Sequence, residues 1–207
     1  MPKDHGIGAS PKRREDVRFL TGAGKYTDDI NIYGQTYCHF LRSDVGHGRI
    51  TSIDTSAAEA MPGVVRIFTG ADFEGIGGLP CGWQVTDKHG APMKEPAHPV
   101  LAIGKVRHVG DPIAAIVAES LEEARDAAEA IEVEIEELPA AVDMKKALEP
   151  DAPRVHDDLE DNLCYDWQFG SDQEAIDKAF AEAAHVTTLE LVNNRLVANP
   201  MEPRVAV

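Results

Sequence analysis

The sequence predicts an α+β (mixed α/β) fold over about residues 20–142. One observation is that the predicted strands and helices follow one another singly along this stretch, without a run of either kind. Another is that its strand segments combine alternating patterns with one continuous apolar run, Pro112–Ala118, of the kind found at the centre of a sheet. The absence of an internal repeat argues against a solenoid or propeller.

The first elements are two strands and a short helix. Thr36–Arg42 alternates and is rich in β-favouring side chains, so it predicts a strand. A glycine turn leads to a second strand at Arg49–Asp54. We expect Ser56–Ala60 to be helical, with Asp54 or Thr55 accepting hydrogen bonds from its first free N–H groups.

The middle of the chain has two further strands separated by a long loop. Val64–Thr69 predicts the third strand, and residues 70–104 are rich in glycine and proline, which indicates loop. Regular structure returns at Lys105–His108. In Pro112–Ala118 the apolar side chains occupy consecutive positions, as a strand buried on both faces requires.

A helix and an alternating strand complete the predicted domain. Ser120 is a good N-cap for a helix over Leu121–Ala130, whose first turn carries Glu122 and Glu123, where the helix dipole favours anions. Ile131–Glu136 alternates strictly, so we expect one buried face and one row of carboxylates.

The end of the chain predicts the beginning of a second domain. Pro150–Pro153 is typical of a boundary, and a short helix at Asp143–Leu148 precedes it. A strand, a helix and a second strand are then expected. Their ranges are Tyr165–Phe169, Asp172–Ala183 and Val186–Asn193. Val205–Val207 resembles the middle of a strand, and we expect the chain to be part of a longer protein.

Composition narrows the possible partners. The 207 residues carry a formal net charge of −16, which disfavours binding to nucleic acid. The acidity fits either a solvated surface or a docking surface for another subunit. No apolar run is long enough to cross a bilayer, and the N-terminus lacks the apolar core of a signal peptide, so we predict a cytoplasmic protein without a membrane span.

The three cysteines, Cys38, Cys81 and Cys164, are far apart and form no C-x-x-C pair. An iron–sulfur cluster or zinc site held by this chain alone is therefore not expected, and neither is a disulfide framework.

Four short patterns suggest chemistry, and each has a simpler explanation. Gly22–Lys25 lacks the helix that a phosphate loop needs, and Gly75–Pro80 has proline in place of the third glycine of a dinucleotide fingerprint. Neither pattern predicts a nucleotide site.

The other two patterns involve histidines and carboxylates. His39, Asp44 and His47 have no ligand spacing that forces them together, so surface or core histidines are the simpler interpretation. The glutamates Glu132, Glu134, Glu136 and Glu137 suggest a solvated strand face, with a calcium-binding surface as an alternative. We therefore predict no catalytic, cofactor-binding or metal-binding residue in this chain.

The order of several phrases is more informative than any one motif. These phrases are Gly6–Ser10, Arg14–Asp16, Leu20–Asp29, Met61–Asp72, His108–Ala118 and Asn199–Arg204. Together they resemble the start of the large, molybdenum-binding subunit of aerobic carbon monoxide dehydrogenases and of the wider xanthine dehydrogenase/aldehyde oxidase family. That family usually has glutamate where Asp111 stands, which leaves the substrate subgroup open.

The resemblance implies an N-terminal arm over 1–19, an α/β hammerhead domain over 20–142 and, over 150–207, the truncated opening strands and helix of a molybdopterin-binding domain. It also implies a parent oxidoreductase with molybdopterin cytosine dinucleotide. Its [2Fe-2S] clusters and FAD would lie on a small iron–sulfur subunit and a medium FAD subunit, in an assembly that is also a homo-oligomer. The segment itself is then a scaffold that is inactive alone. The alternative is a stand-alone hammerhead-fold binding or adaptor module without catalysis.

Overall fold

The computed structural model describes residues 6–170, 172–194, 196, 200–201 and 206. The chain divides into two units, Thr36–Arg195 and Met1–Gln35 with Leu196–Val207. The larger unit contains both sheets. The described part of the smaller unit contains a five-residue helix, α1 (Asp16–Leu20), and a 3-10 turn, Thr27–Asp29.

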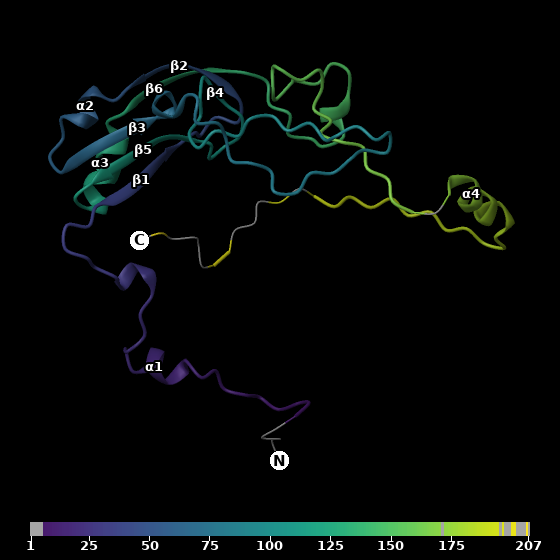
Figure 1. The fold of residues 1–207 in the computed structure, drawn as a ribbon, viewed down its shortest axis with the longest axis horizontal. Helices are drawn as coiled ribbons and strands as arrows, with labels where there is room; N and C mark the ends of the chain where they lie inside the picture. The colour runs from purple at the N-terminus through teal and green to yellow at the C-terminus, as the bar shows by residue number, and fades with distance from the viewer. Residues whose placement is uncertain (1–5, 171, 195, 197–199, 202–205, 207) are drawn as a thin grey trace. The chain divides into compact units, whose positions relative to one another are not determined.

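Two antiparallel three-stranded sheets form the body of the larger unit (Figure 1). The first sheet has the order β1-β5-β3, and the second has the order β4-β2-β6. The bounds are β1 Tyr37–Arg42, β5 Pro112–Ala118, β3 Val64–Thr69, β4 Lys105–Val106, β2 Gly48–Asp54 and β6 Glu132–Glu137. The expected strands of this region are therefore confirmed, with Lys105–His108 shortened to two residues.

Helix α3 (Leu121–Glu129) packs on one face of the first sheet. Ser120 caps it as expected, because its hydroxyl accepts a hydrogen bond from the Glu123 N–H at 3.2 Å. The buried side of the helix consists of Ala124, Ala127 and Ala128. Such small side chains let the helix axis approach the sheet closely.

The short helix α2 (Ser56–Glu59) is one residue shorter than expected. Of the two expected caps, Asp54 provides the contact, since its Oδ1 accepts the Ser56 N–H at 2.9 Å. Asp54 also accepts the Ser56 hydroxyl, and both bonds hold the pKa of its carboxyl below the usual value.

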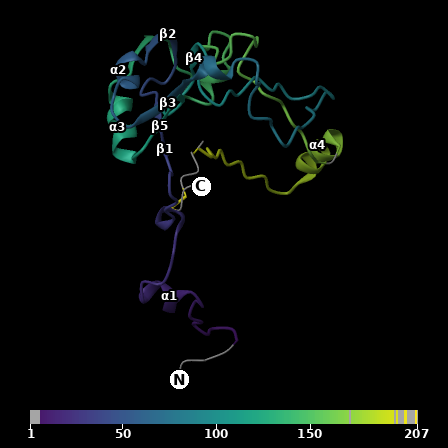
Figure 2. The ribbon, with the colours of Figure 1, turned by 60° about the vertical axis from the view of Figure 1, so that its left-hand side comes forward.

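The core lies between α3 and the first sheet and continues into the second sheet. Ile116 is fully buried at its centre. Ile53 of β2 and Val133 of β6 pack against both this cluster and a smaller one around Val106 and Ile113. These shared contacts join the two sheets into one body, which Figure 2 shows from a second direction.

Strand β5 has one fully buried face and one partly exposed face. Ala114, Ile116 and Ala118 have no exposed surface and point toward α3. On the opposite face Ile113 and Ala115 are buried, and Val117 is half-buried. The expectation that Pro112–Ala118 is buried on both faces is thus confirmed for the face toward α3. On the other face burial is only partial, because Val117 is half-buried.

Three expected elements beyond residue 142 differ in the structure. Asp143–Leu148 forms only a 3-10 turn at Lys146–Leu148, with Asp143 accepting the Lys145 and Lys146 N–H groups. Neither Tyr165–Phe169 nor Val186–Asn193 is a strand, because a strand needs a ladder of backbone hydrogen bonds to a neighbour and neither has one among the described residues. In Tyr165–Phe169, the Asp166 carbonyl accepts the Lys88 N–H at 2.8 Å, and no ladder follows. The predicted strand Val205–Val207 lies outside the described residues except for Ala206.

The predicted helix over Asp172–Ala183 is confirmed as α4 (Gln173–Glu182), with Asp172 as its N-cap. The expectation of a long loop is also confirmed. Residues 70–104 contain a 3-10 turn, Gly70–Phe73, and one isolated bridge between Thr86 and Pro92.

The unequal faces of β5 give the first testable prediction. Ile116→Ala should lower the free energy of unfolding by about 2–5 kcal/mol, because it leaves a cavity in a fully buried site. Val117→Ala, the neighbouring change on the partly exposed face, should cost clearly less. Urea unfolding of both variants measures the difference, and equal losses would show that the two faces of β5 are equally covered.

Candidate functional site

In the glycine-rich segment Gly22–Lys25, the three consecutive N–H groups of Gly22–Gly24 are already used within the chain and cannot form a phosphate nest. The N–H groups of Ala23 and Gly24 both donate to the Arg18 carbonyl, at 2.7 and 2.9 Å, and Gly22 donates to Phe19. These bonds close the C-terminal end of α1. Gly24 is required for another reason, since a Cβ there would lie 2.1 Å from the Phe19 ring.

The second glycine-rich segment, Gly75–Pro80, packs against the loop that carries His98. Leu79 donates its N–H to the His98 carbonyl at 2.8 Å. A Cβ on Gly78 would come within 2.7 Å of the His98 backbone. Close approach of two backbones therefore explains this glycine without a nucleotide.

The histidines of the candidate metal triad have separate surroundings. His47 is buried, and its Nδ1 lies 2.7 Å from the Pro139 carbonyl, so Nδ1 carries the proton. His39 lies on β1, where partial burial, Arg125 and Arg42 lower its pKa. Asp44 is exposed in the turn between β1 and β2. Within the described ranges, no group of three or more histidine, cysteine or acidic side chains is arranged to hold a metal ion.

The glutamate row lies where the alternation places it. Glu132, Glu134 and Glu136 are exposed on β6, an edge strand, while Val133 and Ile135 point into the core. Glu136 lies 3.6 Å from Arg49 on the neighbouring strand. The row is a solvated face with a cross-strand ion pair.

The three cysteines are all free and exposed. Partial burial raises the pKa of the Cys38 thiol, which is the opposite of what an activated nucleophile requires.

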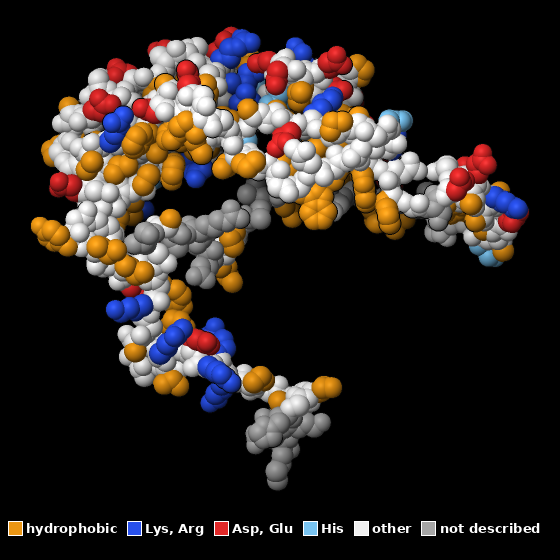
Figure 3. All heavy atoms as spheres, viewed as in Figure 1, with side chains coloured by type: hydrophobic (Ala, Val, Ile, Leu, Met, Phe, Trp, Pro, Cys, Tyr) orange, Lys and Arg blue, Asp and Glu red, His pale blue; other side chains and the backbone are white. Residues whose placement is uncertain are grey.

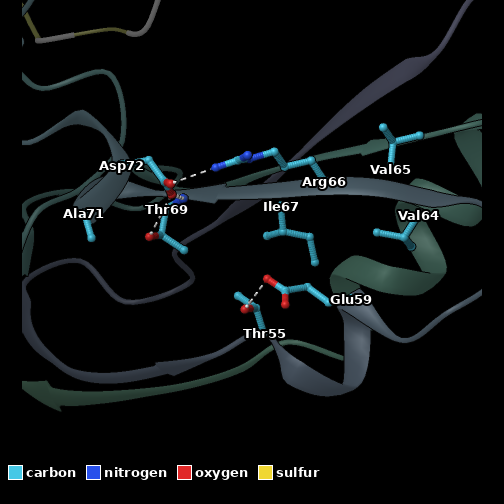
Figure 4. A pocket seen from close by; sticks show the side chains of 9 residues that line it. All are labelled: Thr55, Glu59, Val64, Val65, Arg66, Ile67, Thr69, Ala71 and Asp72. Atoms are coloured by element: carbon cyan, nitrogen blue, oxygen red, sulfur yellow. Dashed lines mark hydrogen bonds and ion pairs between the residues drawn. The ribbon is translucent and has the colours of Figure 1, made fainter.

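A groove of about 640 Å³ runs along the outer edge of β3 (Figure 4). Its charged groups already have partners within the chain. Glu59 accepts the Thr55 hydroxyl at 3.0 Å, and Asp72 accepts the Thr69 N–H at 2.8 Å. That N–H bond and Arg66, 3.6 Å away, hold the pKa of Asp72 below its usual value. The groove is an open recess at a sheet edge. Neither Glu59 nor Asp72 is placed there as a general acid or base, because each is already bonded within the chain.

The segment after Pro150 is fastened to the second sheet by a partly buried ion pair. The Lys105 side chain is only 7% exposed, and its ammonium group contacts both carboxylate oxygens of Asp157, at 2.7 and 2.8 Å. The hydrogen bond from Lys105 holds the pKa of Asp157 below its usual value. Sequence reasoning missed this pair, because nothing in the local pattern indicates that a lysine at the start of a two-residue strand is buried.

Further contacts organise the same segment and tie it to the long loop. Within the segment and to the turn before it, Asn162 accepts the Val155 N–H and donates to the carbonyls of Pro153 and Ala147. Lys94 donates its backbone N–H to the Cys164 carbonyl and pairs its ammonium group with Asp161. Residues 150–166 are therefore attached to the domain that precedes them.

The described residues include no helix that is long and apolar enough to cross a membrane.

The two three-stranded sheets and the packed helix α3 define a small α+β module, and comparison with known proteins gives its class. Residues 21–139 match the family model described as "Aldehyde oxidase and xanthine dehydrogenase, a/b hammerhead domain". The chain belongs to this family.

Curated relatives align with almost the whole chain. The chain is 36% identical to the carbon monoxide dehydrogenase large chain of Afipia carboxidovorans over 213 residues, covering 97% of this chain and 25% of that protein. It is 38% identical to the nicotine 6-hydroxylase large subunit of Paenarthrobacter nicotinovorans, covering 96% of this chain and 23% of that one. The chain thus spans about a quarter of the length of these relatives and matches the N-terminal portion of such large subunits.

Solved structures agree with this assignment. Reconstituted CO dehydrogenase from Oligotropha carboxidovorans superimposes with a TM-score of 0.71 and 35% identity, over 87% of this chain and 23% of that one. Quinoline 2-oxidoreductase from Pseudomonas putida 86 gives a TM-score of 0.64 and 39% identity, over 79% of this chain and 20% of that one. The expected fold class and family are therefore confirmed.

The Lys105–Asp157 pair gives the second prediction. Asp157→Asn should lower the free energy of unfolding at pH 7 by about 1–3 kcal/mol, because it leaves a buried ammonium without its counter-charge. The loss should be near the lower end, since the Asp157 side chain is 64% exposed. Urea unfolding measures it, with the neighbouring exposed Asp158→Asn as the matched control.

The pH dependence follows from the lowered pKa of Asp157. A depressed carboxyl pKa contributes stability above the unfolded value of about 3.9, and that contribution is lost as the pH falls through the folded value. The gap between wild type and Asp157→Asn should therefore close below about pH 4. A gap of constant size down to pH 2 would contradict the ion-pair explanation.

Proposed function

We propose that this chain is the N-terminal scaffold of a molybdenum hydroxylase large subunit and is not catalytic by itself. One observation carries the proposal. Nearly the whole chain aligns with each of these oxidoreductase relatives, yet the aligned part is only about a quarter of the relative's length. The described residues agree with a structural role, because packing and capping contacts account for Gly22–Gly24, Gly78 and His47.

We propose that the chain divides into an arm over 1–19, the hammerhead domain over 20–142 and the opening of a further domain over 150–207. The family match to residues 21–139 supports the middle range. The contacts of Lys105 and Lys94 with Asp157 and Asp161 would then hold the start of the next domain against the hammerhead domain.

The parent enzyme would carry molybdopterin cytosine dinucleotide, with [2Fe-2S] clusters and FAD on partner subunits. The residues described here do not fit the molybdenum cofactor, because the N–H groups of Gly22–Gly24 are used by α1 and the thiols are dispersed. We therefore assign this chain no residue that binds it and no step of the reaction.

The partners implied by this proposal are a medium FAD subunit and a small iron–sulfur subunit in the cytoplasm, within an assembly that is also a homo-oligomer. The acidic surface, with a net charge of −16, would suit docking to basic surfaces of such subunits. It does not suit nucleic acid.

Cofactor content tests the proposal. The purified 207-residue chain should contain far less than one molybdenum per chain by elemental analysis and release no cytosine nucleotide on acid extraction. A holoenzyme of the family, treated in parallel, should give both and serves as the control. Stoichiometric molybdenum in the isolated chain would contradict the scaffold role.

A second measurement separates the scaffold from the stand-alone adaptor. The intact mass of the native gene product should exceed that of the 207-residue chain several-fold. A native product that ends at Val207 would favour the adaptor.

A further inference from the structure

Three lysine–aspartate pairs hold the segment after Pro153 against the long loop and β4. We call residues 155–166 the strap. The pairs follow one order, in which lysines later in the chain contact aspartates earlier in the strap, so the two stretches of chain run antiparallel. Figure 3 shows basic and acidic side chains interspersed near β4. The pairs are Lys88 with Asp166, Lys94 with Asp161 and Lys105 with Asp157, at N···O distances of 2.5, 2.5 and 2.7 Å.

Backbone hydrogen bonds fix the same register. The Lys88 N–H donates to the Asp166 carbonyl at 2.8 Å, and the Lys94 N–H donates to the Cys164 carbonyl at 2.9 Å. The two lysines thus contact the strap through both the backbone and the side chain. Because charge and backbone bonds agree on one alignment, the strap has a specific seat on the loop.

The loop under the strap keeps its shape through bonds of its own. The Asp87 N–H donates to the Ala91 carbonyl at 2.8 Å, and the Met93 N–H donates to the Val85 carbonyl at 3.0 Å. Neither bond involves the strap. The strap can therefore leave the loop without breaking them.

The strap is held mainly by polar contacts. All of its residues lie within the described ranges, and none of them is buried or belongs to a helix or strand. Neither described core cluster includes a strap residue. The side chains of Lys94 and Asp161 are 36% and 54% exposed. Segments with few buried apolar contacts open at a lower free-energy cost than the core of a domain.

We propose that the strap detaches from the loop and β4 as one unit while both sheets stay folded, and that its three ion pairs set how often it detaches. The proposal rests on the proposed function, in which the strap leads from the hammerhead domain into the next domain. Detachment then lets the next domain change its position against an intact hammerhead domain.

Hydrogen exchange of single amides, followed by NMR in the full 207-residue chain, tests this strap. The N–H groups of Lys88 and Lys94 should share one opening constant, because both are bonded to the strap. That constant should exceed those of Asp87 and Met93 in the loop and of Ile116 in the first sheet.

Salt and charge changes test the part played by the ion pairs. Raising NaCl from about 0.05 M to about 0.5 M should raise the shared constant about fivefold, because salt screens the two exposed pairs. Asp161→Asn should raise it about twofold to fivefold at both Lys88 and Lys94. Lys94→Gln should do the same, and the double variant should do no more than either change alone, since both break one pair.

The matched control is Asp158→Asn, the same change at an exposed strap residue outside the three pairs, which should leave the shared constant unchanged. Opening constants of Lys88 and Lys94 that differ more than tenfold, that equal that of Ile116, or that do not respond to Asp161→Asn would overturn the proposal. The scaffold role would survive each of these results, because the molybdenum content of the isolated chain tests it separately.

Discussion

The structure depends on the close packing of β5 against helix α3. Ala114 and Ala118 leave room on the strand, and Ala124, Ala127 and Ala128 leave room on the helix, so that Ile116 fills the space between them. Small residues on both surfaces fix the distance between the layers, and a larger side chain at these positions would force them apart. The outer strands β1 and β3 both pair with β5, so the whole first sheet is positioned by this contact. The second sheet joins it through Ile53 and Val133.

Local patterns were sufficient to predict most of the elements in Thr36–Glu137. The continuous apolar run gave β5 its correct bounds, and Ser120 and Asp172 marked the starts of α3 and α4. These signals are local, because they depend on neighbours along the chain. The strand predictions at Tyr165–Phe169 and Val186–Asn193 were wrong because strand formation does not depend on local signals alone. Their alternation is suitable for a strand, but a strand also requires a neighbour, which no local pattern supplies.

The sequence already argued against the candidate motifs, and the structure shows what their residues do instead. Gly24 and Gly78 are glycines because a ring and a backbone pass close to them. His47 is a buried residue bonded to the Pro139 carbonyl. The features that distinguish the chain are contacts between distant segments, such as Lys105 with Asp157 and Phe40 with Ala115. Such contacts hold segments of the chain together. They are consistent with a structural segment of a protein whose chemistry takes place in another part.

We propose that the chain supports a reaction centre without containing one. The most direct test is turnover by the isolated 207-residue chain, offered carbon monoxide, an aldehyde or a purine with an artificial electron acceptor. The account predicts no reduction of the acceptor above the rate without protein. Sustained turnover of any of these substrates by the isolated chain would contradict it.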